Sequence, residues 1–300
     1  MEGQLSRIEK SLEEAVKARQ TALRSRAHEA GGPAEICTEN TKFRPAEIPV
    51  VKAEDVDGRI ACIREPNSYV AEQFRKLRAR IKAAPGGAPR SIMITSSGIG
   101  EGKTVTSVNL AAALANELDN TVLLVDTDLR NPMVHKYLGL LPKAGLSDYL
   151  KGAVELKDVL IKTGIGRLVV LPAGNIPENP SELLSSMRMT ALAEELKQRY
   201  SDRYIVYDSP PLLATADSVT LARHMDGILF VMSAGRTPNK SAQRAMQLLK
   251  GHRVLGAVFN NVQEQLARSM YPYPYELAGA HANGKKAGTP DGAGNGADVK

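Results

Sequence analysis

The chain has 300 residues, 43% of them hydrophobic, and a formal net charge of +6. This length allows one sizeable core with appendages, and no window reaches the roughly 18 unbroken apolar residues of a membrane span. The charged N-terminus is unlike a secretory signal, and Cys37 and Cys62 form no metal-binding spacing, which indicates reduced thiols and a cytoplasmic chain.

The first part of the chain predicts appendages to a catalytic domain. Apolar residues at helical spacing indicate an amphipathic helix over residues 1–30. Glycines and prolines with little periodicity indicate a linker over residues 31–66. A second helix is predicted over residues 68–84, where Pro85 and two glycines end it.

From residue 90 onward, short apolar runs alternate with helical stretches. The predicted strands are 91–96, 121–126, 167–172, 204–208, 227–232 and 254–260. The predicted helices are 103–118, 181–199, 214–224 and 238–250. Several runs are apolar without alternation, which is typical of strands covered on both faces. We therefore expect an α/β domain over residues 67–276 with a doubly wound, mostly parallel sheet, followed by a disordered Gly/Ala-rich tail over 277–300.

The first predicted strand runs into a glycine-rich turn and then a helix, the arrangement of a phosphate-binding loop (P-loop). Glycines let successive backbone N–H groups converge on an anion, and the helix adds the positive end of its dipole. Lys103 is predicted to reach the β- and γ-phosphates, and the Thr104 hydroxyl to bind Mg²⁺. Asn260, at the end of the last predicted strand, is an adenine contact or an ordinary turn residue. The predicted nucleotide-binding loop consists of Gly98, Ile99, Gly100, Glu101, Gly102, Lys103, Thr104 and Val105.

Two later predicted strands each end in a carboxylate, Asp126 and Asp208. Ligands of parallel sheets sit beyond the carboxyl ends of the strands, so these residues should converge on the P-loop. Mg²⁺ prefers oxygen ligands and keeps several waters. We therefore predict a site for ATP with Mg²⁺, in which Thr104 is a direct ligand and the two aspartates hold metal-bound waters.

These motifs, read in order as TSSGIGEGKT, VLLVDTDLR and YIVYDSPP, resemble those of the bacterial tyrosine kinases of exopolysaccharide and capsule assembly. That family is a branch of the P-loop group that includes the ParA/MinD ATPases, and its second Walker-type motif, DxDxR, is the specific signal. The resemblance implies an ATP-dependent protein-tyrosine autokinase that regulates polymerisation and export. The N-terminal SRIEKSLEEA resembles the start of the stand-alone kinases associated with exosortase loci.

The same resemblance implies catalytic roles for Lys103, Asp126, Asp128 and Arg130. A tyrosine hydroxyl profits from a base at neutral pH, and Asp126 is the first candidate, with Asp128 in reserve. Arg130 would steady one of these carboxylates or a phosphate.

Two further stretches agree with the family. Glu72, Arg75 and Arg78 match its ExxRxxR helix, which implies ring-like self-association; the alternative is an ordinary surface helix. Tyr271, Tyr273 and Tyr275 match its C-terminal tyrosine cluster and are the expected phospho-acceptors, because alternating prolines keep the segment extended. The alternative is a packed or docking segment.

The resemblance also implies partners. Members of that family usually need an activating cytoplasmic segment from a membrane chain-length regulator, and we expect a separate chain to supply it. The protein would then be cytoplasmic and recruited to the inner face of the plasma membrane, with indirect membrane contact and no specific nucleic acid. Two other functions stay open. The first is a ParA/MinD-like positioning ATPase, which the five basic residues of 75–82 would suit because they could bind DNA or lipid. The second is a non-kinase ATP-binding scaffold of polysaccharide export. Gly98 stands where the positioning ATPases commonly carry an extra lysine, which argues against the first.

Overall fold

The computed structural model describes residues 51–117, 120–198 and 203–263. The predicted helix over 1–30, the tyrosine cluster and the predicted tail over 277–300 lie outside the described residues. Among the described residues, none of the helices is both long and apolar enough to cross a bilayer.

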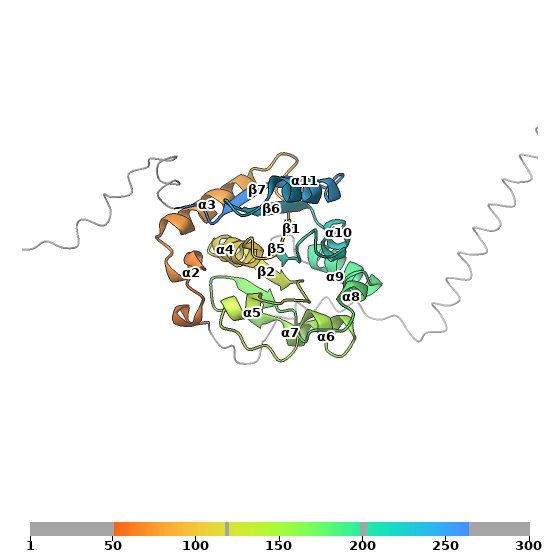
Figure 1. The fold of residues 1–300 in the computed structure, drawn as a ribbon. Coiled ribbons are helices and arrows are strands. Elements are labelled where there is room, and N and C mark those ends of the chain that lie inside the picture. Colours follow the sequence, from red (N-terminus) through yellow and green to blue (C-terminus); the bar gives the residue numbers. More distant parts are fainter. Residues whose placement is uncertain (1–50, 118–119, 199–202, 264–300) are drawn as a thin grey trace, which may run out of the picture. The chain divides into compact units, whose positions relative to one another are not determined.

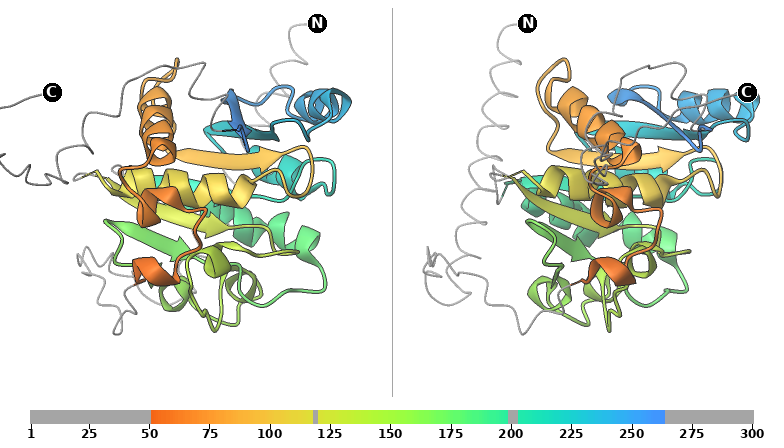
Figure 2. Two further views of the ribbon diagram at one scale, coloured as in Figure 1. Left: turned by 60° about the vertical axis from the view of Figure 1, so that its left-hand side comes forward. Right: turned by 90° about the vertical axis from the view of Figure 1, so that its left-hand side faces the viewer.

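The described part is built on one sheet with helices on both faces (Figures 1 and 2). Its strand order is β3-β4-β2-β5-β1-β6-β7. Every pair is parallel except the pairing of β3 with β4. The strands are β1 (Ser91–Ser96), β2 (Thr121–Asp126), β3 (Ile161–Lys162), β4 (Leu168–Leu171), β5 (Arg203–Asp208), β6 (Gly227–Ser233) and β7 (Val254–Asn260). The predicted α/β fold with a mostly parallel, doubly wound sheet is confirmed.

Two hydrophobic clusters fill the space between the sheet and its helices. Alternate residues of the central strands face opposite ways, as the pleat requires: Ile92 and Ile94 join one cluster, and Met93 joins the other.

The helices are α2 (Ala61–Arg64), α3 (Tyr69–Lys82), α4 (Lys103–Ala115), α5 (Val134–Tyr137), α6 (Leu146–Leu150), α7 (Leu156–Val159), α8 (Pro180–Leu184), α9 (Met187–Gln198), α10 (Asp217–Ala222) and α11 (Asn239–Leu248), with a 3₁₀ turn, η1, at Ala53–Asp55.

The helix expected over 181–199 is two helices in the structure. Ser186 interrupts it, because its hydroxyl donates to the Leu183 carbonyl and accepts from the Met189 N–H. The serine thereby closes α8 and caps α9, a role for which a short hydroxyl side chain is suited.

The linker predicted over 31–66 is wrong for residues 51–66, which are part of the domain. Ile60 is fully buried, and Asn109 of α4 binds this segment at two points. It accepts from the Cys62 N–H at 2.9 Å and donates to the Arg59 carbonyl at 3.0 Å. A few well-spaced apolar residues and one buried amide are enough to hold a segment without periodicity, so the domain begins before the predicted residue 67.

Candidate active site

The P-loop connects β1 to α4 and takes the backbone shape that its glycines allow. Gly100 and Gly102 have φ of 76° and 94°, a region that only glycine enters freely. The second of these caps α4, so the loop passes directly into the helix whose N-terminus favours anions. Lys103 follows as the first helical residue and is mostly buried.

Glu101 braces this loop from inside. Its carboxylate accepts hydrogen bonds from the Ser97 hydroxyl at 2.8 Å, the Gly98 N–H at 3.0 Å and the Thr237 hydroxyl at 2.7 Å. Burial opposes the charge, but these hydrogen bonds outweigh it and hold the pKa of Glu101 below its ordinary value. The Glu101 side chain therefore shapes the P-loop, and only its backbone is free to face a nucleotide.

Asn260 lies against the same loop. Its side-chain amide donates to the Glu101 carbonyl at 3.1 Å, and it packs so closely on Gly102 that a Cβ at this position would overlap it. Asn260, the last residue of β7, therefore packs on the predicted nucleotide-binding loop. Its contact with adenine stays a prediction.

The two strand-end aspartates meet beside the loop. Asp126 and Asp208 are partners in the register of β2 and β5, and both are fully buried. Asp208 Oδ1 accepts from the Ser107 hydroxyl at 2.8 Å. Its other oxygen, Oδ2, is buried and has no hydrogen-bond partner among the described residues. A buried carboxylate oxygen without a donor is costly, and a metal-bound water would satisfy it.

The charges at this point also fit a cation. Burial raises the pKa of Asp208 to about 6, although Thr104, Lys103 and Ser107 favour its charged form. Burial and the neighbouring Asp208 raise the pKa of Asp126 well above its ordinary value. Among the described residues, no group of three His, Cys, Asp or Glu is placed to ligate a metal together. Mg²⁺ prefers oxygen ligands and keeps several waters. The two carboxylates and the Thr104 hydroxyl could provide such oxygens; binding of Mg²⁺ here stays a prediction.

Asp126 and Asp128 differ in burial and in their hydrogen-bond partners. The oxygens of Asp126 accept backbone N–H groups, from Asp128 at 3.2 Å and from Val134 at 3.1 Å. Asp128 remains 9% exposed, and its Oδ1 accepts the Asn131 N–H at 3.1 Å. Burial raises the pKa of Asp128, and the positive charge of Lys103 opposes this shift. Asp128 and Lys103 are therefore close enough to interact electrostatically.

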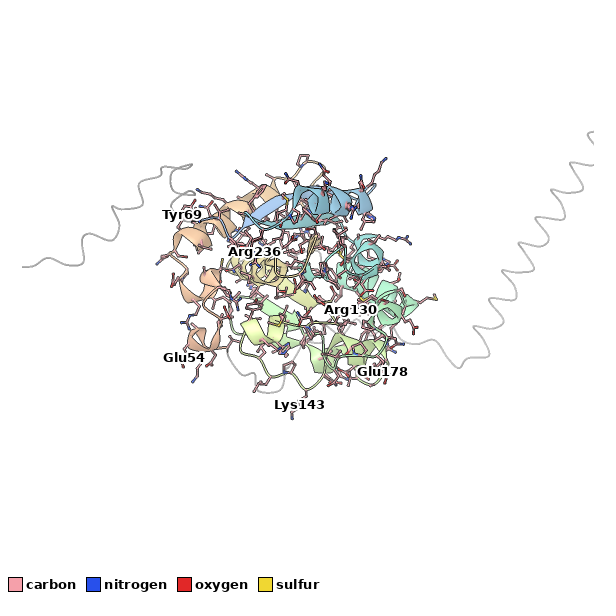
Figure 3. The ribbon with its side chains drawn as sticks, viewed as in Figure 1. Glu54, Tyr69, Arg130, Lys143, Glu178 and Arg236 are labelled. Carbon is pink, nitrogen blue, oxygen red and sulfur yellow. The ribbon has the colours of Figure 1, made fainter. Side chains whose placement is uncertain are left out.

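The Arg130 guanidinium pairs with Asp217 rather than with Asp126 or Asp128, so the prediction that it steadies one of these carboxylates is wrong. Only the Arg130 backbone N–H bonds Asp128, and a contact with a phosphate stays a prediction. Its guanidinium donates to Asp217 Oδ2 at 3.0 Å and to the Ser181 hydroxyl at 2.8 Å, and it is labelled in Figure 3. Asp217 is almost fully buried at the start of α10, and a buried carboxylate draws the nearest arginine. Arg130 therefore links the loop after β2 to α8 and α10.

Sequence reasoning missed four residues that support the site: Ser107, Ser181, Asp217 and Thr237. A signal existed for Ser107, because residues four apart lie on one face of a helix and Ser107 follows Lys103 at that spacing. The others come from distant segments, and nothing local marks them.

The residues of the ExxRxxR match are engaged within the chain. Arg75 pairs with Glu72 at 2.5 Å and donates to the Pro66 carbonyl. Arg78 donates to the Ala113 carbonyl and pairs with Glu117 at 3.2 Å. Self-association through these residues stays a prediction. The expected phospho-acceptors Tyr271, Tyr273 and Tyr275 lie outside the described residues.

The chain resembles known proteins over most of its length. Residues 92–273 match the family model of the CobQ/CobB/MinD/ParA nucleotide-binding domain. The tyrosine-protein kinase YwqD of Bacillus subtilis is 37% identical over 204 residues, which are 67% of this chain and 85% of that protein. The tyrosine-protein kinase CpsD of Streptococcus agalactiae serotype III is 32% identical over 73% of this chain and 92% of its own.

A solved structure agrees. The kinase domain of the Escherichia coli tyrosine kinase ETK superposes with a TM-score of 0.65 at 30% identity, covering 75% of this chain and 86% of that domain. Sequence and structure therefore place this chain in the bacterial tyrosine-protein kinase family, within the CobQ/CobB/MinD/ParA nucleotide-binding group.

Proposed function

We propose that this chain is an ATP-dependent, magnesium-using protein-tyrosine kinase that phosphorylates copies of its own chain and acts in exopolysaccharide or capsule assembly. One observation carries the chemistry: Lys103, Asp126 and Asp208 converge at the carboxyl ends of neighbouring strands, and the buried Oδ2 of Asp208 has no hydrogen-bond donor within the described part of the chain. The kinase names of the relatives carry the choice of acceptor.

Each residue of the site has a task in phosphoryl transfer, which depends mainly on positioning and on charge stabilisation. The loop N–H groups and the Lys103 ammonium stabilise charge on the transferred phosphoryl and the leaving diphosphate. Thr104, Asp126 and Asp208 would hold Mg²⁺ and its waters. When bound, Mg²⁺ supplies further neutralisation of the phosphate oxygens.

A base for the tyrosine proton comes from the loop after β2. Asp126 is fully buried and its oxygens accept backbone N–H groups, whereas Asp128, although also buried, keeps 9% of its surface exposed and interacts with the charge of Lys103. We therefore assign proton removal to Asp128, although the sequence resemblance puts Asp126 first. A base must reach the proton that it takes, and of these two buried carboxylates only Asp128 keeps any surface exposed.

The test is tyrosine labelling of the full-length chain with Mg-ATP, detected with an anti-phosphotyrosine antibody. Wild type should become labelled, and Lys103→Met should neither bind nucleotide nor become labelled. Normal labelling of Lys103→Met would rule out the mechanism. Nucleotide binding with hydrolysis but no phosphotyrosine would favour a positioning ATPase, and binding without either would favour a scaffold.

The activator, the oligomer and the location form part of the proposal. We infer that a cytoplasmic segment of a membrane chain-length regulator activates this kinase. The same regulator recruits the kinase to the inner face of the plasma membrane. Copies of the chain associate in a ring through α3. The labelling assay run with and without such a segment tests the first inference, and full activity alone would count against it. The association with exosortase loci stays a prediction.

A further inference from the structure

A cavity of about 430 Å³ opens beside the outer turn of the P-loop. Three segments line it: loop residues 97–101, the pair Leu213 and Ala214 after β5, and residues between the end of β6 and the first turn of α11. Its size falls within the range of small-molecule and side-chain pockets, about 300–1,000 Å³. Asn260, the residue expected near the adenine, is not among the lining residues.

The rim of this cavity is apolar on one side. Ile99 is 81% exposed and Leu213 is 42% exposed, and Pro238 adds a third apolar surface. Single exposed apolar residues are common and need no explanation. Here two come from distant segments and line one cavity next to a phosphate site, which provides a surface for a planar ring.

The other side of the cavity carries a positive charge. Arg236 lines it and is labelled in Figure 3. Over the described residues its guanidinium has no ion-pair partner. Arginine matches phosphate oxygens with a fork of donors, so this side chain is available to an anion beside the P-loop.

Hydrogen bonds fix the position of the turn that bears Arg236. The Thr237 hydroxyl accepts from the Ser233 N–H at 2.9 Å and donates to the Glu101 carboxylate at 2.7 Å. The Arg236 N–H donates to the Ser233 carbonyl at 3.1 Å. The turn is therefore closed on itself and attached to the P-loop, so the arginine backbone is positioned before any ligand arrives.

We propose that this cavity is the subsite for the acceptor tyrosine, an assignment that rests on the proposed kinase function. Ile99 and Leu213 contact the tyrosine ring. Arg236 contacts the phosphoryl group as that group reaches the tyrosine oxygen. In this step a bond forms between the phenolic oxygen and the γ-phosphorus. The bond from that phosphorus to the β–γ bridging oxygen breaks, ADP leaves with the electron pair, and the phenolic proton passes to Asp128.

A two-chain assay tests this subsite. The full-length enzyme phosphorylates a size-tagged, full-length Lys103→Met chain, which cannot label itself, and initial rates are measured against acceptor concentration. Leu213→Ser should raise the acceptor KM about five- to tenfold with kcat little changed, because part of a ring contact is lost. Arg236→Gln should lower kcat at least about tenfold with KM little changed, because charge on the transferring group loses a donor.

Two variants serve as matched controls, and nucleotide affinity is the second readout. Leu141 is 96% exposed and Arg244 is also exposed, and neither lines the cavity, so Leu141→Ser and Arg244→Gln should match wild type. The affinity for a fluorescent ATP analogue should be unchanged in Leu213→Ser and Arg236→Gln.

Two outcomes would overturn the subsite. Unchanged KM and kcat in both cavity variants would show that the acceptor binds elsewhere, and a parallel loss of analogue affinity would assign the cavity to the nucleotide base. If wild type leaves the acceptor unlabelled, the proposed kinase function itself fails, and that result is seen before any cavity variant is compared.

Discussion

Asp126 and Asp208 stand opposite each other on β2 and β5, so two fully buried carboxylates lie side by side where both strands end. Such a pair is unfavourable while both are charged and no cation is near. The carboxylate pair should therefore lower the stability of the folded protein when both groups are charged and no cation is bound.

The stability of the metal-free protein should depend on Asp208 with a defined sign. Burial raises the pKa of Asp208 from 3.8 to about 6, so between these values the folded protein binds more protons than the unfolded chain. The contribution of this group to stability is therefore present below pH 4 and is lost as the pH rises through 6. A shift of this size corresponds to about 3 kcal/mol.

The measurement compares wild type with Asp208→Asn by urea unfolding in a chelating buffer from pH 4.5 to 7.5. Groups away from the site titrate alike in both proteins, so their difference reports Asp208 together with its effect on Asp126, whose pKa Asp208 raises; removing Asp208 changes both contributions in the same direction. The variant should gain stability relative to wild type as the pH rises, and Mg-ATP should stabilise only wild type at pH 7.5. A difference that is flat with pH would mean that Asp208 is not strained in the absence of the cation.

Gly102→Ala should disable the P-loop for two separable reasons. The residue has φ of 94°, which costs a non-glycine residue about 1 kcal/mol or more, and its new methyl group would overlap the Asn260 amide. The single variant should lose stability and nucleotide binding. Adding Asn260→Ala removes the overlap but not the backbone strain, so the double variant should recover part of the stability. No recovery at all would place the whole cost in the backbone.

Arg130 should act on stability through Asp217. Arg130→Ala leaves a nearly fully buried carboxylate without its counter-charge, and we expect a loss of about 1–3 kcal/mol in the free energy of unfolding. Asp217→Asn in the same chain removes the buried charge and should restore part of that loss. If the two effects simply add, the pair is not coupled and Arg130 has another role.

The sequence predicted the positions of the strands and of the central site well, for a physical reason. A strand buried on both faces is an uninterrupted apolar run, so β1 and β2 begin and end at the predicted residues. The bounds of β7 also match, although it is an edge strand whose residues are partly exposed. A polar residue that ends such a run must lie at the carboxyl edge of a parallel sheet, and this alone brought Asp126 and Asp208 to the P-loop.

The failures share a different reason. The partner of Arg130 is 87 residues away in the sequence, at the start of a helix that positions it only after the fold has formed. Residues 51–66 are held by Ile60 and by the side chain of Asn109, which leave no periodic pattern. The two-residue antiparallel strand β3 is too short to produce one.

Replacing Tyr271, Tyr273 and Tyr275 together by phenylalanine should leave ATP affinity unchanged and remove most of the phosphate incorporated. The reason is chemical: phenylalanine preserves the ring but lacks the hydroxyl that accepts phosphate, so binding in the cavity beside Ile99 survives while transfer does not. Tyr69→Phe, at the first residue of α3, is the matched control and should label like wild type.

Labelling that is unchanged in the triple variant would place the acceptors elsewhere, and phosphopeptide mapping of wild type would then identify them. Because the triple variant keeps its catalytic site, it should still phosphorylate a Lys103→Met chain in trans, and that activity distinguishes a lost acceptor from a damaged enzyme.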